Sequence, residues 1–158
     1  MKTIYLVRHA KTGEALKDCD RKLTETGMER THKLGQYLKL MSTKIDVMYA
    51  STAVRAKQTA EILAPYVKKK VNKIIYEDKL YLTHEDEYFQ ILIGLADKTK
   101  NVLFVGHNPD ITNVLRFFIP DFNGFLRTNE CYCIDIQAET WQEIFTAGKE
   151  IRFSKLIR

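Results

Sequence analysis

Short apolar runs alternate with longer amphipathic stretches along the first two-thirds of this 158-residue chain. The short runs are aliphatic or β-branched and predict buried strands, and the longer stretches carry apolar side chains at helical spacing. The strand predictions cover residues 3–7, 46–50, 72–76 and 102–105. The helix predictions run from Thr24 or Thr26 to Met41, over 53–65, from Thr83 to about Ala96, and from Asn108 onward.

The last part of the chain has a different pattern. Residues 131–137, 141–147 and 150–156 alternate apolar and polar side chains, which predicts three antiparallel strands at an edge. The regular alternation of strands and helices before them predicts a mostly parallel sheet. We therefore expect an α/β fold: a single-domain three-layer sandwich over residues 1–158, with helices on both faces and antiparallel edge strands from the C-terminal segment.

Several polar residues are typical of helix boundaries. Thr26 and Glu29 have the spacing of a capping box, although Thr24 is an equally good cap, and Thr83–Asp86 has the same form. Other boundary predictions place Ser51 or Thr52 before the second helix and Pro65 at its end, and Asn108 as the N-cap of the fourth helix with Pro109 in its first turn.

Composition narrows the class of protein. The apolar content is 45%, with no run near the roughly 20 residues of a membrane span. The N-terminus lacks the pattern of a signal peptide, so we expect a cytoplasmic protein without a membrane partner. The three cysteines, Cys19, Cys131 and Cys133, lack metal-site spacing and are expected to be reduced.

The net charge of +5 favours an anionic partner. The densest basic run, Lys68–Lys70, lies between a predicted helix and a predicted strand and is not interleaved with aromatic residues. Because base stacking needs such aromatics, we do not expect a nucleic-acid partner.

Polar side chains gather where three of the predicted strands end. The carboxyl ends of parallel strands share one edge of a sheet, where α/β proteins hold their ligands. The side chains at these ends are Arg8 and His9 after the first strand, Ser51, Thr52 and Arg55 after the second, and His107 after the fourth. Arginine and helix N-termini both favour anions, so the sequence predicts an anion site.

Two histidines in an anion site call for a further explanation. A neutral imidazole has a free nitrogen lone pair and can act as a covalent nucleophile. The sequence has no phosphate-binding glycine loop and no cluster of carboxylates at the predicted edge that would hold a metal ion. This combination indicates phosphoryl transfer through a phosphohistidine, with no cofactor and no metal.

Four segments resemble a known family. Leu6–Lys11 (LVRHAK), Ser51–Ala60 (STAVRAKQTA) and Val105–Pro109 (VGHNP) look like three motifs of the histidine phosphatase superfamily. Asp20–Gly27 (DRKLTETG) resembles the segment that opens the first helix in the SixA branch, the phosphohistidine phosphatases. The four segments follow one another in the family's order, which makes the match more specific than any single motif.

The resemblance implies roles for individual residues. His9 would be the nucleophile, and Arg8, Arg55 and His107 would bind the phosphoryl group. Arg21 matches an arginine near the SixA site, although a solvated loop charge explains it almost as well. The implied partner is a phosphohistidine-bearing protein, such as a histidine phosphotransfer domain, with phosphate as the product.

The resemblance does not extend to a general acid. Most members of the superfamily use a carboxylic acid after the third strand, where this chain has Glu77, Asp78, Glu85 and Asp86 without a clear family motif. Imidazole leaves far more easily than an alkoxide, so a missing acid favours cleavage of a P–N bond. The alternatives are a small-molecule phosphomonoesterase of the same superfamily and a non-catalytic phosphoprotein-binding module.

Overall fold

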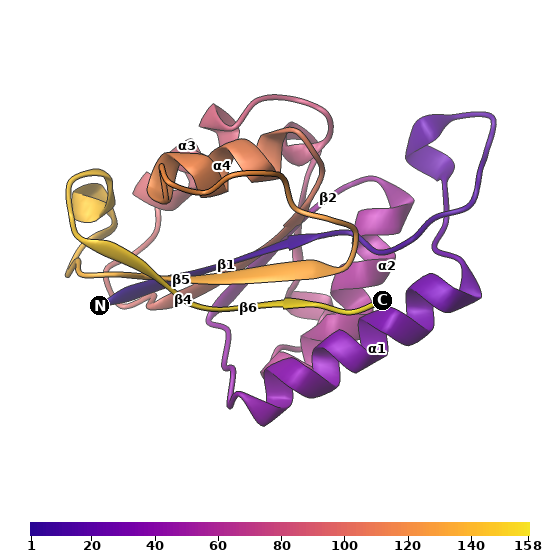
Figure 1. The fold of residues 1–158 in the computed structure, drawn as a ribbon, viewed down its shortest axis with the longest axis horizontal. Helices are drawn as coiled ribbons and strands as arrows, with labels where there is room; N and C mark the ends of the chain where they lie inside the picture. Colours follow the sequence, from indigo (N-terminus) through magenta and orange to yellow (C-terminus); the bar gives the residue numbers. More distant parts are fainter.

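A six-stranded sheet lies between two layers of helices in the computed structural model, which describes residues 1–158 (Figure 1). The strand order is β3-β2-β4-β1-β5-β6. The strands are β1 (Lys2–Arg8), β2 (Val47–Ser51), β3 (Ile75–Glu77), β4 (Asn101–Gly106), β5 (Glu130–Ile136) and β6 (Lys149–Leu156). The helices are α1 (Glu25–Leu40), α2 (Val54–Leu63), α3 (Asp86–Ile93) and α4 (Asp110–Phe118).

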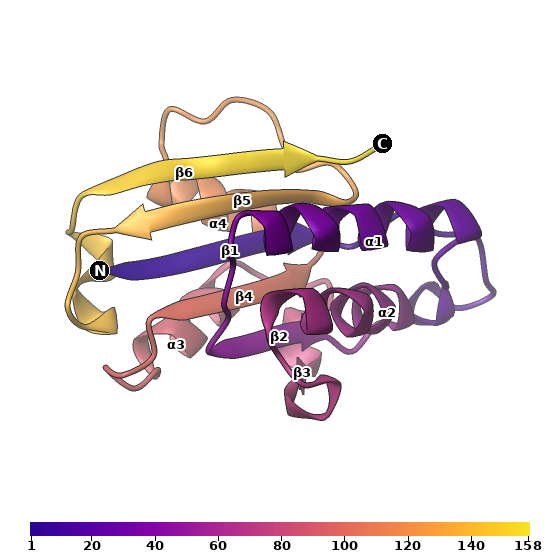
Figure 2. The ribbon, with the colours of Figure 1, turned by 90° about the horizontal axis from the view of Figure 1, so that it is seen from below.

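Strand direction confirms the predicted fold class. β1 pairs with β4, β4 with β2, and β2 with β3, all in parallel. β5 is antiparallel to both of its neighbours, β1 and β6, so it alone runs against the other strands (Figure 2). The antiparallel pairs come from the C-terminal segment, as the alternating pattern predicted.

The sheet separates two hydrophobic cores. Side chains alternate across a strand, so Tyr5 and Val7 of β1 face the core under α1 and α2, whereas Ile4 and Leu6 face the core under α3 and α4 (Figure 1). β1 and β4 are buried on both faces, which is why their sequences read as continuous apolar runs. None of the helices is long and apolar enough to cross a membrane.

The prediction of a strand over 141–147 was wrong. Residues Trp141–Phe145 form a 3₁₀ helix, and the Trp141 indole donates to the carbonyl of Thr99 at 2.9 Å. A 3₁₀ helix has three residues per turn, so Trp141 and Ile144 both face the core from one side. In a strand, side chains three positions apart lie on opposite faces, so the 3₁₀ turn is what allows both side chains to be buried in one core.

One helix start matches a predicted cap, and two differ from theirs. Thr24 caps α1, its Oγ1 accepting from the amide of Gly27 at 3.0 Å, which decides against Thr26. Ala53, and not Ser51 or Thr52, is the N-cap of α2. Pro109, and not Asn108, is the N-cap of α4.

The remaining boundaries shift for local reasons. α3 spans Asp86–Ile93, and it begins after the predicted Thr83 because the Thr83 amide donates to Asp110 at 3.0 Å and no capping box forms. α2 ends at Leu63, and Pro65 lies in the 3₁₀ helix Ala64–Val67 that follows. β3 begins only at Ile75, because residues 71–73 form another 3₁₀ turn.

Candidate active site

A polar cavity of about 270 Å³ lies at the edge of the sheet where β1, β2 and β4 end. Parallel pairing sets Arg8 of β1 opposite Gly106 of β4, so His9 and His107 follow side by side. The two imidazole rings are 5.1 Å apart between centroids. The cavity is lined by Arg8, His9, Thr12, Asp18, Arg21, Arg55, Leu82, His107, Asn108 and Thr128. All five predicted site residues are among them.

His9 is held in one tautomer. Its Nδ1 lies 2.8 Å from the carbonyl oxygen of Ala10, which can only accept, so Nδ1 carries the hydrogen. Its Nε2 lies 3.3 Å from Nε of Arg55, which can only donate, so Nε2 presents its lone pair. The residue is 7% exposed. His9 therefore presents a fixed nitrogen lone pair inside the cavity.

Arg55 and Arg8 supply positive charge beside that nitrogen. Arg55 projects from the first turn of α2 and is 3% exposed. Arg8 donates through Nη1 to the carbonyl of Leu126 at 3.2 Å, but its buried Nε has no protein partner. Burial and the neighbouring Arg55 lower the pKa of Arg8. An unpaired, buried guanidinium donor is costly unless a ligand completes its bonding.

His107 is oriented by the end of β2. The Ser51 hydroxyl accepts from the amide of Ala53 at 3.2 Å and lies 2.8 Å from Nε2 of His107. The other ring nitrogen of His107, Nδ1, is buried and has no protein partner. Ser51, predicted as a helix cap, instead holds the ring of this histidine in place.

Burial keeps both histidines neutral. Desolvation lowers the pKa of His9 to about 3, with Arg55, Arg8 and Arg21 adding to the effect against the carbonyl of Ala10. Desolvation likewise lowers the pKa of His107 to about 3, with further lowering by His9 and the arginines. The Nε2 lone pair of His9 is therefore free of a proton at neutral pH, as a nucleophile requires.

These depressed pKa values predict how stability depends on pH. In the unfolded chain the histidines have ordinary pKa values near 6.5. Between about pH 6.5 and 3 the unfolded chain therefore binds protons at these two histidines, and the folded chain does not. The free energy of unfolding is therefore expected to fall as the pH falls through this window, by up to about 1.4 kcal/mol per pH unit for each histidine. When the free energy of unfolding is measured by urea denaturation between neutral pH and about pH 5, it should fall less steeply with falling pH in His9→Gln than in the wild type. The same dependence on pH in the variant and the wild type would contradict the argument that burial lowers the pKa of His9.

Asp18 is a cavity residue that the sequence did not indicate. Its carboxylate accepts from Arg55 Nη2 at 2.9 Å, from Arg21 Nη1 at 3.2 Å and from the Tyr81 hydroxyl at 2.7 Å. Arg21 also donates to Thr12 Oγ1 at 2.6 Å. Arg21 thus lies in the cavity wall and is tied to the same carboxylate as Arg55.

The loop that carries Asp18 and Arg21 is anchored on both sides. Thr59 of α2 accepts from the amide of Ala10 at 3.1 Å, and Gln58 accepts from the amide of Leu23 at 2.8 Å. A β-carbon on Gly27 would lie 2.3 Å from the carbonyl oxygen of Lys11, so the close approach of α1 to this loop requires glycine. These contacts join residues that are far apart in the sequence, so no local motif predicts them.

None of the four carboxylates considered as a general acid lines the cavity. Asp78 accepts from Thr52, Glu85 accepts from Asn113, and Asp86 pairs with His84 at 3.3 Å. The remaining one, Glu77, ends β3. Tyr81, which lies between Asp78 and Glu85 in the sequence, does approach the site: its ring lies 5.6 Å from that of His107. Among the described residues, no group of three or more His, Cys, Asp or Glu side chains is arranged to hold a metal ion.

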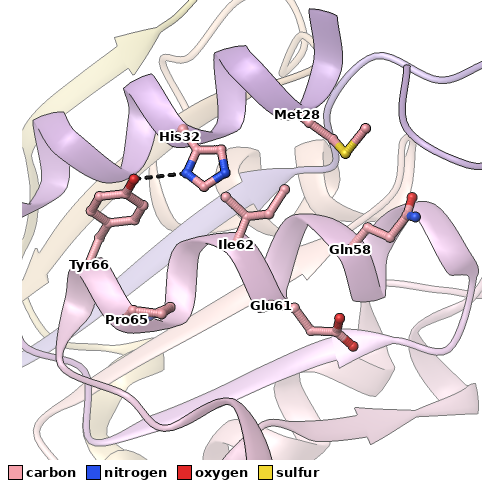
Figure 3. A pocket seen from close by; sticks show the side chains of 7 residues that line it. All are labelled: Met28, His32, Gln58, Glu61, Ile62, Pro65 and Tyr66. Atoms are coloured by element: carbon pink, nitrogen blue, oxygen red, sulfur yellow. Dashed lines mark hydrogen bonds between the residues drawn. The ribbon is translucent and has the colours of Figure 1, made fainter. Parts of the chain in front are cut away.

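A second cavity, of about 480 Å³, opens between α1 and α2 (Figure 3). His32 of α1 points toward Tyr66 across this groove, and its Nδ1 lies 2.8 Å from the tyrosine hydroxyl. Met28 and Ile62 supply apolar surface. The groove contains none of the predicted site residues. No lysine or arginine lines it, and it carries the carboxylate of Glu61, so it lacks the positive charge that would attract an anion.

The fold and the cavity together define an α/β protein with an anion site built around a neutral histidine. Comparison with known proteins agrees with this class. The family model of the histidine phosphatase superfamily (branch 1) matches residues 4–80. This match covers just under half of the chain, and together with the fold the similarity indicates a phosphatase.

Solved structures extend the likeness over the whole chain. A protein assigned as the phosphohistidine phosphatase SixA from Nakamurella multipartitia has a TM-score of 0.82 at 25% identity, covering 99% of this chain and 96% of that one. A second, from Agrobacterium tumefaciens, has a TM-score of 0.81 at 22% identity, covering 98% and 97%. The protein histidine phosphatase SixA in complex with tungstate has a TM-score of 0.82 at 16% identity, covering 96% and 95%. An uncharacterized protein of Mycobacterium leprae is 27% identical over 117 residues, 68% of each chain.

Proposed function

We propose that this protein is a phosphohistidine phosphatase that removes the phosphoryl group from a histidine of a partner protein through a covalent intermediate on His9. One observation carries the proposal: the Nε2 lone pair of His9 is fixed and neutral, and lies at 3.3 Å from Arg55 in a cavity with two further arginines. The likeness to SixA structures supports the same class of substrate. We expect it to act in the cytoplasm, where its thiols stay reduced.

The first step is a displacement at phosphorus. The bond from phosphorus to His9 Nε2 forms while the bond to the substrate imidazole breaks, and the electron pair of that bond stays on the leaving nitrogen. A phosphohistidine binds a proton on its other ring nitrogen, so the imidazole departs neutral without a protein acid. Arg8, Arg55 and His107 stabilise the charge on the equatorial oxygens, and Arg55 exchanges its bond to His9 for one to the phosphoryl group.

The second step is hydrolysis. Water attacks phosphorus, the bond from phosphorus to Nε2 breaks, and the electron pair returns to the imidazole of His9. The proton of the water leaves with the phosphate product or to solvent. His9 returns to its starting tautomer because the carbonyl of Ala10 retains the hydrogen on Nδ1.

The proposal that the protein cleaves a P–N bond and not a P–O bond rests on the ionisation state of the carboxylate in the cavity. The only carboxylate in the cavity is Asp18, and its pKa is held far below the usual range by hydrogen bonds from Tyr81, Arg55 and Arg21. An ionised carboxylate cannot protonate an alkoxide, which would leave poorly without that proton. The site is therefore suited to a leaving group that needs no protein acid.

The test compares two substrates. A histidine phosphotransfer domain phosphorylated on histidine should release phosphate at least about a hundredfold faster, by kcat/KM, than an alkyl phosphate monoester such as a sugar phosphate. Faster turnover of the monoester would favour the small-molecule phosphomonoesterase. Tight binding of the phosphoprotein with no release of phosphate would favour the binding module.

A further inference from the structure

Asp18 and the phosphoryl site share the same guanidinium group. Arg55 directs Nε at the nucleophilic nitrogen of His9, at 3.3 Å, and directs Nη1 and Nη2 at Asp18. Nη1 donates to the backbone carbonyl of Asp18 at 2.7 Å, and Nη2 donates to its carboxylate at 2.9 Å. A phosphoryl group on His9 would lie beside the guanidinium that the carboxylate already occupies.

The carboxylate also engages the second arginine at the cavity mouth. Arg21 Nη1 donates to Asp18 Oδ1 at 3.2 Å, and the Tyr81 hydroxyl donates to Oδ2 at 2.7 Å. Tyr81 belongs to the segment after β3, so its bond to Asp18 joins the two loops that line the cavity. One carboxylate therefore accepts hydrogen bonds from two of the three arginines of the cavity, Arg55 and Arg21.

Asp18 is permanently charged and accessible. Hydrogen bonds from Tyr81 and from both arginines hold its pKa well below the ordinary value, so it is ionised at every physiological pH. Its side chain is 42% exposed, whereas that of Arg55 is 4% exposed. The carboxylate can thus move outward into water, while the buried arginine cannot follow it.

We propose that Asp18 is a resident anion that competes with phosphate for Arg55 and Arg21, and thereby weakens the hold of the cavity on the phosphate product. This inference rests on the proposed function, because it assigns phosphate as the product of this site. Three arginines around a neutral histidine would bind a divalent anion tightly, and a tightly bound product slows turnover. One negative charge set among them lowers the affinity for the free anion.

The backbone carbonyl of Asp18 has a separate role. It holds Arg55 Nη1 whether or not the carboxylate is charged, so replacing the side chain leaves one anchor on Arg55. The competing charge and the positioning of Arg55 can therefore be separated by substitution. Asparagine keeps the size and one accepting oxygen of the aspartate, removes its charge and replaces the second accepting oxygen with an NH2 donor.

The experiment measures binding of inorganic phosphate to the whole protein by isothermal titration calorimetry, which requires no turnover. Asp18→Asn is expected to bind orthophosphate at least about tenfold tighter than the wild type, since a like charge within a few ångströms of the anion is lost. Asp18→Ala should also bind it more tightly. Asp20→Asn is the matched control, because Asp20 lies on the same turn, carries the same charge and contacts no arginine. This control should stay within about twofold of the wild type, because exposed charges farther away are screened.

Affinity that is unchanged or weaker in Asp18→Asn would overturn the proposal, since the carboxylate would then only position Arg55. An equal gain in Asp20→Asn would overturn it as well, because the effect would be one of net charge. Absence of measurable phosphate binding in both the wild type and Asp18→Asn would also contradict it. Phosphatase activity is scored separately, so tighter phosphate binding without turnover would count against the proposed function alone.

Discussion

Replacement of His9 by alanine is expected to abolish release of phosphate from a phosphohistidine protein, with a loss in kcat of at least about a thousandfold. In the proposed mechanism the nucleophile is the Nε2 lone pair of His9, and the carbonyl of Ala10 keeps the ring hydrogen on Nδ1. No neighbouring side chain can take its place. His107 is committed to Ser51 at 2.8 Å through the corresponding nitrogen.

The fold should survive this change. His9 follows the last residue of β1 and contributes no side chain to either hydrophobic core. Removing a desolvated imidazole leaves a small polar cavity, which costs little compared with a core truncation. His32→Ala, on the exposed side of α1, is the matched control and should keep full activity. Wild-type turnover in His9→Ala, measured as phosphate release under saturating substrate, would refute His9 as the nucleophile.

Replacement of Arg8 by methionine is expected to separate activity from stability. Arg8 donates only to the carbonyl of Leu126, and no acidic side chain pairs with it. Its loss removes charge stabilisation of the transition state, on the scale of about 10²–10³ in kcat, as for one lost oxyanion donor. An apolar side chain of similar length fills the same space without a desolvated charge, so the free energy of unfolding should be unchanged or raised by about 1 kcal/mol.

Two measurements check this expectation on the same protein. Steady-state kinetics on the phosphoprotein gives the loss in kcat, and urea denaturation gives the change in the free energy of unfolding. Arg30→Met, on α1 and outside the cavity, controls for the loss of one positive charge. A variant that is both markedly less stable and fully active would show that Arg8 has a structural role only.

The sequence predicted the parts of the site that follow from strand topology. Arg8, His9 and His107 come directly after apolar runs, and parallel strands bring their carboxyl ends to one edge. Arg55 follows from the same rule, because it lies in the first turn of the helix after β2. The proximity of these residues could be predicted from the sequence because the direction of the strands determines which strand ends lie next to each other.

The parts that were missed depend on contacts between distant segments. Asp18 enters the cavity only because α2 holds both ends of its loop, through Thr59 and Gln58. The bond from Tyr81 to Asp18 spans 63 positions in the sequence, and no local motif indicates it. The 3₁₀ helix at Trp141 was mistaken for a strand because burial of its indole, and not local propensity, decides the conformation.

The central claim is that phosphate passes through His9, and one measurement tests it most directly. A histidine phosphotransfer domain phosphorylated on histidine is mixed with the protein, quenched within one turnover without acid, and the peptide that contains His9 is examined by mass spectrometry. We predict a transient phosphoryl group on His9 that rises and decays as inorganic phosphate appears. Release of phosphate with no label on His9 at any time would contradict the covalent mechanism, because the phosphoryl group would then pass directly to water.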